Sequence, residues 1–121
     1  MKEVVHMIKK AEDMVLEIKE NMRGGKGSIE ILHILKQDEL KGKCRLFAKI
    51  TVNPGCSIGL HEHENEEEIF YIIKGKGIFD DNGTITELSA GDSILTGGGA
   101  KHSVENKGDE ILEIVAVILL Y

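Results

Sequence analysis

The sequence predicts an all-β fold, either a sandwich or a barrel. Short apolar or alternating runs follow one another from residue 28 to the C-terminus, and turn residues separate them. After residue 20, no segment shows the apolar spacing of a helix of useful length. The chain has 14 glycines and 1 proline, so we expect its turns to use mostly glycine and Asn or Asp.

The first 20 residues carry two competing patterns. Apolar residues at helical spacing are Val4, Ile8, Ala11, Val15 and Ile18. Met14, Leu16 and Ile18 also alternate as they would in a strand. We expect a short helical or irregular start and then a strand near residues 14–19. The glycine-rich stretch 23–27 is expected to be a flexible loop, because no strand and following helix frame it as a phosphate-binding site.

From residue 28 onward, turn signals divide the chain into a series of short strands. The expected strands are 28–35, 45–52, 57–62, 68–74, 77–80, 84–88, 93–96, 101–105 and 110–119. The clearest hairpin lies around Asn82-Gly83, because this pair supplies the two positive-φ residues of a primed turn.

Two of these strands are apolar on both faces. They are 69–73 and 111–120, the latter interrupted only by Glu113. A half-exposed strand alternates in polarity, so we expect both faces of these two strands to be covered. One face fills the interior, and the other requires a second layer or a second subunit. We predict a homodimer, with the alternative that another part of the same chain covers the outer face.

The length and charge of the chain restrict its organisation and its partners. At 121 residues we expect one domain over 1–121, with an N-terminal segment and loop over 1–27 and a barrel over 28–121. The formal net charge of −6, with no basic stripe, argues against nucleic acid or an anionic membrane as partner.

Targeting features and cysteine usage indicate a cytoplasmic protein. The N-terminus lacks the uninterrupted apolar core of a signal peptide, and no run is long enough to cross a membrane. Two cysteines, Cys44 and Cys56, at unrelated positions are typical of reduced thiols.

Histidine and glutamate residues form a candidate metal site. His61 and His63 are separated by one residue, so on a strand both point to the same side. Glu68 stands at the head of the next apolar run, and His102 opens another strand. Imidazole and carboxylate together suit a divalent transition metal. Glu67 is an alternative carboxylate, but strand parity and the distance to Gly75 favour Glu68.

Glycines at fixed spacing surround these residues. The first pattern is glycine, five residues, His-x-His, four residues, glutamate, six residues and glycine: Gly55, His61, His63, Glu68 and Gly75. The second consists of Gly91, Gly97, Gly99, His102 and Asn106. Together they resemble the two signatures of the cupin family over roughly residues 45–120. Gly97 stands where the family pattern has proline, which puts in doubt only the stiffness of the turn before His102.

The resemblance implies a cupin-type jelly-roll β-barrel, also called a double-stranded β-helix, with a metal inside and one mouth open to a ligand. It implies that His61, His63, Glu68 and His102 bind one divalent transition metal ion (Mn, Fe, Ni, Co, Zn or Cu). If Glu68 points inward, Phe70 and Ile72 share its side and line the cavity. Asn106 has an expected outer-shell or turn role.

The remaining polar residues have expected roles away from the metal. Glu62, Glu64, Glu66 and Glu67 are interpreted as a solvated acidic rim. His6 and His33 lie outside the motifs and are interpreted as surface or structural histidines. The two arginines, Arg23 and Arg45, cannot be placed in the cavity from the sequence. The sequence therefore names no general acid or base beyond the metal ligands.

Three functional hypotheses follow from this site. The leading hypothesis is a metal-dependent enzyme acting on a small, anionic, carboxylate-type molecule, as a decarboxylase, dioxygenase, lyase or isomerase. Small cupins of this kind resemble the halves of oxalate-decarboxylating bicupins. The second hypothesis is a non-catalytic module that captures a small acid through the metal, and the third is a purely structural metal site.

Overall fold

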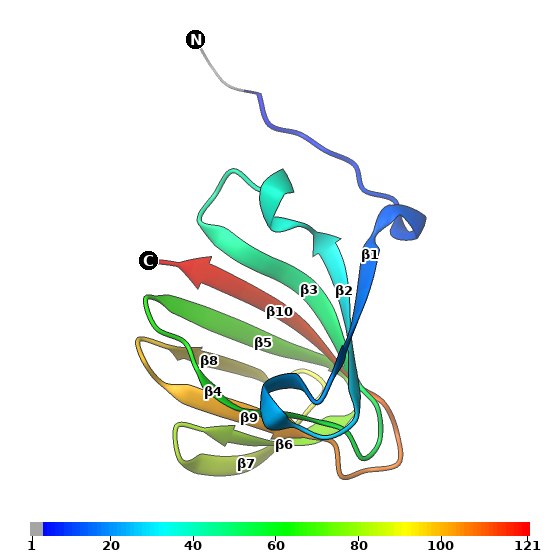
Figure 1. Cartoon of the computed structure of the whole chain (residues 1–121), viewed down its shortest axis with the longest axis vertical. Coiled ribbons are helices and arrows are strands. Elements are labelled where there is room, and N and C mark those ends of the chain that lie inside the picture. The colour runs from blue at the N-terminus through cyan, green and yellow to red at the C-terminus, as the bar shows by residue number, and fades with distance from the viewer. Residues whose placement is uncertain (1–3) are drawn as a thin grey trace.

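A computed structural model describes residues 4–121, which form ten strands and three short 3₁₀ turns (Figure 1). The strands are β1 (Val15–Glu20), β2 (Ser28–Leu35), β3 (Cys44–Val52), β4 (Ser57–Glu62), β5 (Glu66–Lys74), β6 (Lys76–Asp81), β7 (Thr84–Ser89), β8 (Ser93–Gly97), β9 (Lys101–Glu105) and β10 (Leu112–Leu120). The 3₁₀ turns are η1 (Ala11–Asp13), η2 (Met22–Gly24) and η3 (Gln37–Glu39). The all-β prediction is confirmed, and no helix among the described residues is long and apolar enough to cross a membrane.

The strands form two facing antiparallel sheets (Figure 1). The larger sheet has the order β1-β2-β3-β10-β5-β8, and the smaller has the order β4-β9-β6-β7. From β3 onward the chain passes repeatedly from one sheet to the other, and only the β6–β7 hairpin keeps two consecutive strands in one sheet. This winding is the jelly-roll arrangement that the sequence resemblance implied.

Alternate side chains along the strands point inward and fill the space between the two sheets. On β10, the side chains of Leu112, Ile114 and Ala116 are fully buried, whereas those between them are less buried. Phe79 of the smaller sheet and Phe70 of the larger sheet meet edge to face, with ring centroids 6.3 Å apart. The core closes one end of the sandwich and leaves polar side chains toward the other.

The β6–β7 hairpin has the turn that the sequence predicts. Asn82 and Gly83 both adopt positive φ, at 50° and 96°. The amide of Gly83 also donates to the Asp80 carboxylate at 2.9 Å, which fixes the turn. The strand pairing on either side therefore follows from local chemistry.

The N-terminal part departs from the expected division at residue 28. The strand expected near residues 14–19 is present as β1, and it pairs with β2 at the edge of the larger sheet. The sheet therefore begins at Val15. Residues 4–10 extend away from the sheets (Figure 1), and Lys9 forms an ion pair with Glu39 at 2.6 Å.

The outer face of the larger sheet remains apolar and open. Tyr71 on β5 is 48% exposed, and Leu95 on β8 is 60% exposed. Val117 lies between β3 and β5 on this face, opposite Phe47 and Ile69. Within residues 4–121, no segment shields Tyr71 and Leu95.

Candidate metal centre

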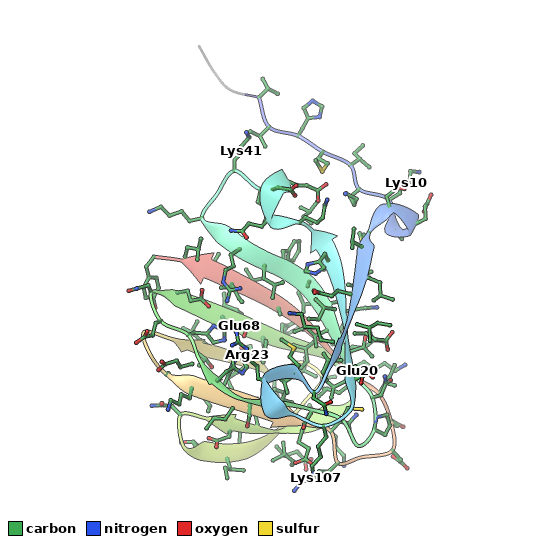
Figure 2. All side chains as sticks on the ribbon, in the orientation of Figure 1. Lys10, Glu20, Arg23, Lys41, Glu68 and Lys107 are labelled. Atoms are coloured by element: carbon green, nitrogen blue, oxygen red, sulfur yellow. The ribbon has the colours of Figure 1, made fainter. Side chains whose placement is uncertain are left out.

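Four side chains converge between the sheets near the open end. His61 on β4 and His102 on β9 are direct partners in the register of the smaller sheet. His63 follows the end of β4, where its amide donates to the carbonyl of Ala100 at 3.1 Å. Glu68 reaches them from β5 of the larger sheet, and Figure 2 shows it inside the sandwich. The structure thus brings together the four residues that the motifs single out.

The donor atoms of the four residues meet closely. The Nε2 atom of His102 lies 3.0 Å from Nε2 of His63 and 3.1 Å from Nε2 of His61. Glu68 Oε1 lies 2.9 Å from His63 Nε2 and 3.0 Å from His102 Nε2. Neighbouring ligands about 2.1 Å from one six-coordinate ion are separated by about 3.0 Å. The spacing of these atoms therefore fits a shared cation.

The hydrogen bonds on the far side of two rings fix which nitrogen faces the centre. Nδ1 of His61 donates to the carbonyl of Gly59 at 2.7 Å. Nδ1 of His63 donates to the Glu66 carboxylate at 2.6 Å. When the two rings are neutral, each has its one N–H on Nδ1, and both Nε2 atoms then present lone pairs toward the Glu68 carboxylate. Converging acceptors of this kind repel one another unless a cation lies between them.

His102 is held by packing instead. Its ring stacks on Phe70 with centroids 4.9 Å apart and an interplanar angle of 15°. Its Nδ1 atom is buried and has no hydrogen-bond partner among the described residues. A buried nitrogen without a partner is costly. The Nε2 atom of this ring, by contrast, faces the Nε2 atoms of His63 and His61, so Nε2 is the nitrogen positioned to bind a metal.

The environment shifts the pKa values of these side chains in different directions. Burial lowers the pKa of His61, which favours the neutral ring that binds metal. When His63 is protonated, its Nε2 donates to Glu68, and this hydrogen bond raises the pKa of His63, so a metal ion would have to displace that proton. Burial raises the pKa of Glu68, but hydrogen bonds from His102 and His63 outweigh it and leave that pKa lowered. The Glu68 carboxylate is therefore ionised at neutral pH and ready to bind a cation.

Glu66 is not part of a solvated rim, which corrects the interpretation of the acidic stretch. It is buried, and the guanidinium of Arg45 donates to both of its oxygens at 2.8 Å. These hydrogen bonds lower the pKa of Glu66 to about 2. Glu62 and Glu64 are exposed as expected. The inward position of Glu66 could have been predicted from the sequence, because Glu66 stands two residues before Glu68 and so shares its side of the strand.

A cavity of about 620 Å³ is lined by three of the four residues, His61, His63 and Glu68. Phe70 lines it, as expected, together with Ile31, Ile50 and Ile118. Ile72 is fully buried in the core and is not among the lining residues. The wall next to the ligands is therefore largely apolar.

Polar residues from the N-terminal third line the mouth of the same cavity. Both arginines are there, Arg45 from β3 and Arg23 from η2. His33 also lines it and forms a pair with Glu17, with His33 Nε2 3.0 Å from Glu17 Oε1. The sequence did not place Glu17 or Arg23 in the cavity, because β1 and η2 carry no motif that locates them.

Comparisons with known proteins agree with this fold. A family model described as the cupin domain matches residues 48–118. A protein of Thermotoga maritima called oxalate-binding protein is 46% identical over 120 residues, covering 99% of this chain and 99% of the relative. An uncharacterised protein of Methanocaldococcus jannaschii is 34% identical over 89 residues, covering 74% of this chain and 70% of that protein.

Solved structures extend the comparison to three dimensions. The crystal structure of a predicted oxalate decarboxylase from Thermotoga maritima matches with a TM-score of 0.89 and 45% identity. The match covers 95% of this chain and 100% of that chain. The polyketide cyclase RemF from Streptomyces resistomycificus matches with a TM-score of 0.76, covering 94% of this chain and 80% of its own. At 19% identity, the likeness to RemF shows the fold alone.

Proposed function

The chain belongs to the cupin family, and from this premise we propose that it binds a small carboxylate anion, such as oxalate, through one divalent transition-metal ion. His61, His63, Glu68 and His102 hold the ion. The bound ion supplies a Lewis-acidic point that attracts carboxylate oxygens. The observation that carries the proposal is the convergence of two imidazole lone pairs and an ionised carboxylate on one point.

The charge of the centre favours an anion. Three neutral imidazoles and one carboxylate leave a divalent ion with a local charge of about +1. An ion that prefers six ligands would keep positions for ligand oxygens or water beside these four side chains. A small carboxylate fills these positions and lowers the net charge of the buried centre.

The cavity has the size and lining for a small acid. Its volume of about 620 Å³ is within the range of small-molecule sites. Phe70 supplies an apolar wall, and Arg23 at the mouth supplies positive charge. The name of the Thermotoga maritima relative, oxalate-binding protein, supports a dicarboxylate as the ligand class.

Catalysis is the second candidate, and the His33–Glu17 pair favours it. This pair lines the cavity and combines a group that can donate a proton with one that can accept it. Cleavage of the carbon–carbon bond of hydrogen oxalate yields formate and carbon dioxide, and the acid proton becomes the C–H proton of formate. The name of the matched structure, a predicted oxalate decarboxylase, is consistent with this reaction.

Calorimetric titration of oxalate into the protein tests the proposal. The protein reconstituted with Mn²⁺ is expected to bind one oxalate per chain, and the metal-free protein none. Assays for formate and carbon dioxide in the same samples separate binding from turnover. Equal binding by the metal-free protein, or none by the loaded protein, contradicts the proposed function.

We also propose that two copies of the chain pair through the outer face of the larger sheet. Tyr71 and Leu95 are exposed there, and Ile69 lies between Leu95 on β8 and Val117 on β10. An apolar face of this kind is costly in water. A second copy offers the same face, so a two-fold interface is self-complementary.

A further inference from the structure

The two arginines at the mouth of the cavity differ in whether their guanidinium groups have a hydrogen-bond partner. Arg45 is engaged, because its guanidinium donates two hydrogen bonds to Glu66. Arg23 lines the same cavity, yet within residues 4–121 its guanidinium has no ion pair or hydrogen bond. Figure 2 labels Arg23 and Glu68, which come from η2 and β5 and both line the cavity.

The other charged side chains at this mouth are already paired. Glu17 faces His33 at 3.0 Å and Lys19 at 3.8 Å. Glu20 accepts a hydrogen bond from Ser28 at 2.6 Å. Among residues 4–121, Arg23 is therefore the cation at the mouth that is available to bind an incoming anion.

The backbone places Arg23 at some energetic cost. Its φ of 55° and ψ of 30° lie in the left-handed region, which a side chain of this size seldom adopts. Such a conformation costs about 1 kcal/mol or more and persists where the surroundings enforce it. The turn that carries it is anchored at both ends. Asn21 donates from its side chain to the carbonyl of Gly25 and from its backbone amide to the carbonyl of Gly27, and the Lys26 amide donates to Ser57 Oγ at 2.8 Å.

Two glycines allow this turn to pack closely against β4. A Cβ atom at Gly59 would overlap the carbonyl oxygen of Arg23, and one at Gly25 would overlap that of Ser57. Only glycine permits this approach of the two backbones. Gly59 also accepts the Nδ1 hydrogen bond of His61. The same short segment of β4 thus orients a metal ligand and positions Arg23.

We propose that Arg23 recognises the second negative charge of a dicarboxylate held at the metal centre. This inference rests on the proposed function. A dianion on a centre of charge about +1 leaves a net charge of about −1, which one guanidinium neutralises. Arg23 presents a planar fork that pairs with two carboxylate oxygens, so it favours a dianion over a monoanion of similar size.

The test measures binding of oxalate and of glycolate, a chelating monoanion, to protein reconstituted with Mn²⁺. The variants are Arg23→Gln and a control, Lys107→Gln, which removes the same charge from the loop between β9 and β10 (Figure 2). Arg23→Gln is expected to weaken oxalate binding about ten-fold and glycolate binding about two-fold or less. Lys107→Gln is expected to change neither, and Mn²⁺ content and thermal midpoint are expected to match the wild type in both variants.

Three results overturn the inference, and they differ in what else they affect. If Arg23→Gln binds oxalate as tightly as the wild type, Arg23 has no part in recognition and the proposed function stands. If it weakens oxalate and glycolate equally, Arg23 acts only as a general positive charge. If the loaded wild type binds no oxalate, the inference and the proposed function fail together.

Discussion

The Glu66 carboxylate lies 2.6 Å from Nδ1 of His63, and it thereby determines which nitrogen of that ring faces the other ligands. Arg45 holds the carboxylate from the opposite side with two hydrogen bonds. A chain of three side chains thus runs from the cavity mouth to the metal centre. Carboxylates that accept from the far nitrogen of a ligating imidazole fix its orientation and raise its basicity.

Removing this carboxylate is expected to weaken metal binding. Glu66→Gln loses the charged acceptor for His63 Nδ1, and we expect metal affinity to fall about ten- to a hundred-fold. Competition with a chelating dye measures the change. Glu64→Gln is the matched control, because Glu64 is exposed in the same turn. Equal affinity in the two variants would show that Glu66 does not support the site.

The lowered pKa of Glu66 predicts a pH dependence of stability. Its folded-state pKa of about 2 lies below the ordinary value of 4.5. Its stabilising contribution is therefore complete above pH 4.5 and is lost as the pH falls toward 2. The contribution is at most about 3 kcal/mol, reduced by the partial exposure of Arg45.

Urea unfolding of the metal-free protein at pH 7 and pH 3 measures this effect. The stability difference between wild type and Glu66→Gln is expected to shrink by about 2 kcal/mol at the lower pH. Glu64→Gln serves again as the comparison. A difference that is the same at both pH values would contradict the assigned contact with Arg45.

A methyl group at Gly59 is expected to separate η2 from β4. Its Cβ would meet the carbonyl of Arg23, so Gly59→Ala is predicted to destabilise the protein by about 2 kcal/mol. Oxalate binding is expected to weaken as well, because the turn that carries Arg23 is displaced. Gly42→Ala is the control, since a Cβ there meets no atom within 4 Å. Thermal unfolding and calorimetry report both effects, and equal behaviour of the two variants would exclude the close approach.

A charge on the outer face of the larger sheet is expected to dissociate the dimer. Tyr71→Lys places an ammonium in the proposed interface, so sedimentation is predicted to shift to the 13.3 kDa monomer. Ile85→Lys is the comparison, because Ile85 is an exposed apolar residue on β7 of the smaller sheet. A wild-type protein that sediments as a monomer would remove the interface altogether.

The sequence predicted the strands from local periodicity, and strand parity together with the resemblance to the cupin signatures singled out the four residues that the structure brings together. His61 and His63 share a side by strand parity, and the spaced glycines identify the turns that aim Glu68 and His102. The same parity places Tyr71 on the side of β5 opposite Glu68 and Phe70, and Tyr71 is 48% exposed. The ambiguous N-terminus became a strand through its pairing with β2, a contact that no local pattern specifies.

The residues of the cavity mouth escaped prediction for a different reason. The pairing of β10 with β3 skips Arg45, because Ile118 faces Leu46 and Leu119 faces Cys44. This irregularity turns Arg45 toward the cavity, whereas regular alternation from Leu46 would point it outward. Arg23 depends on a left-handed turn and on its docking to β4. Neither feature leaves a periodic signal.

Metal analysis of the purified protein and of a His61→Ala, His102→Ala double variant tests the central claim most directly. Both proteins are reconstituted at neutral pH, where the imidazoles are free to bind, and then dialysed. We predict about one equivalent of a divalent transition metal in the wild type and none in the double variant. No metal in the wild type, or the same amount in both proteins, would contradict the assignment of these residues as the metal centre.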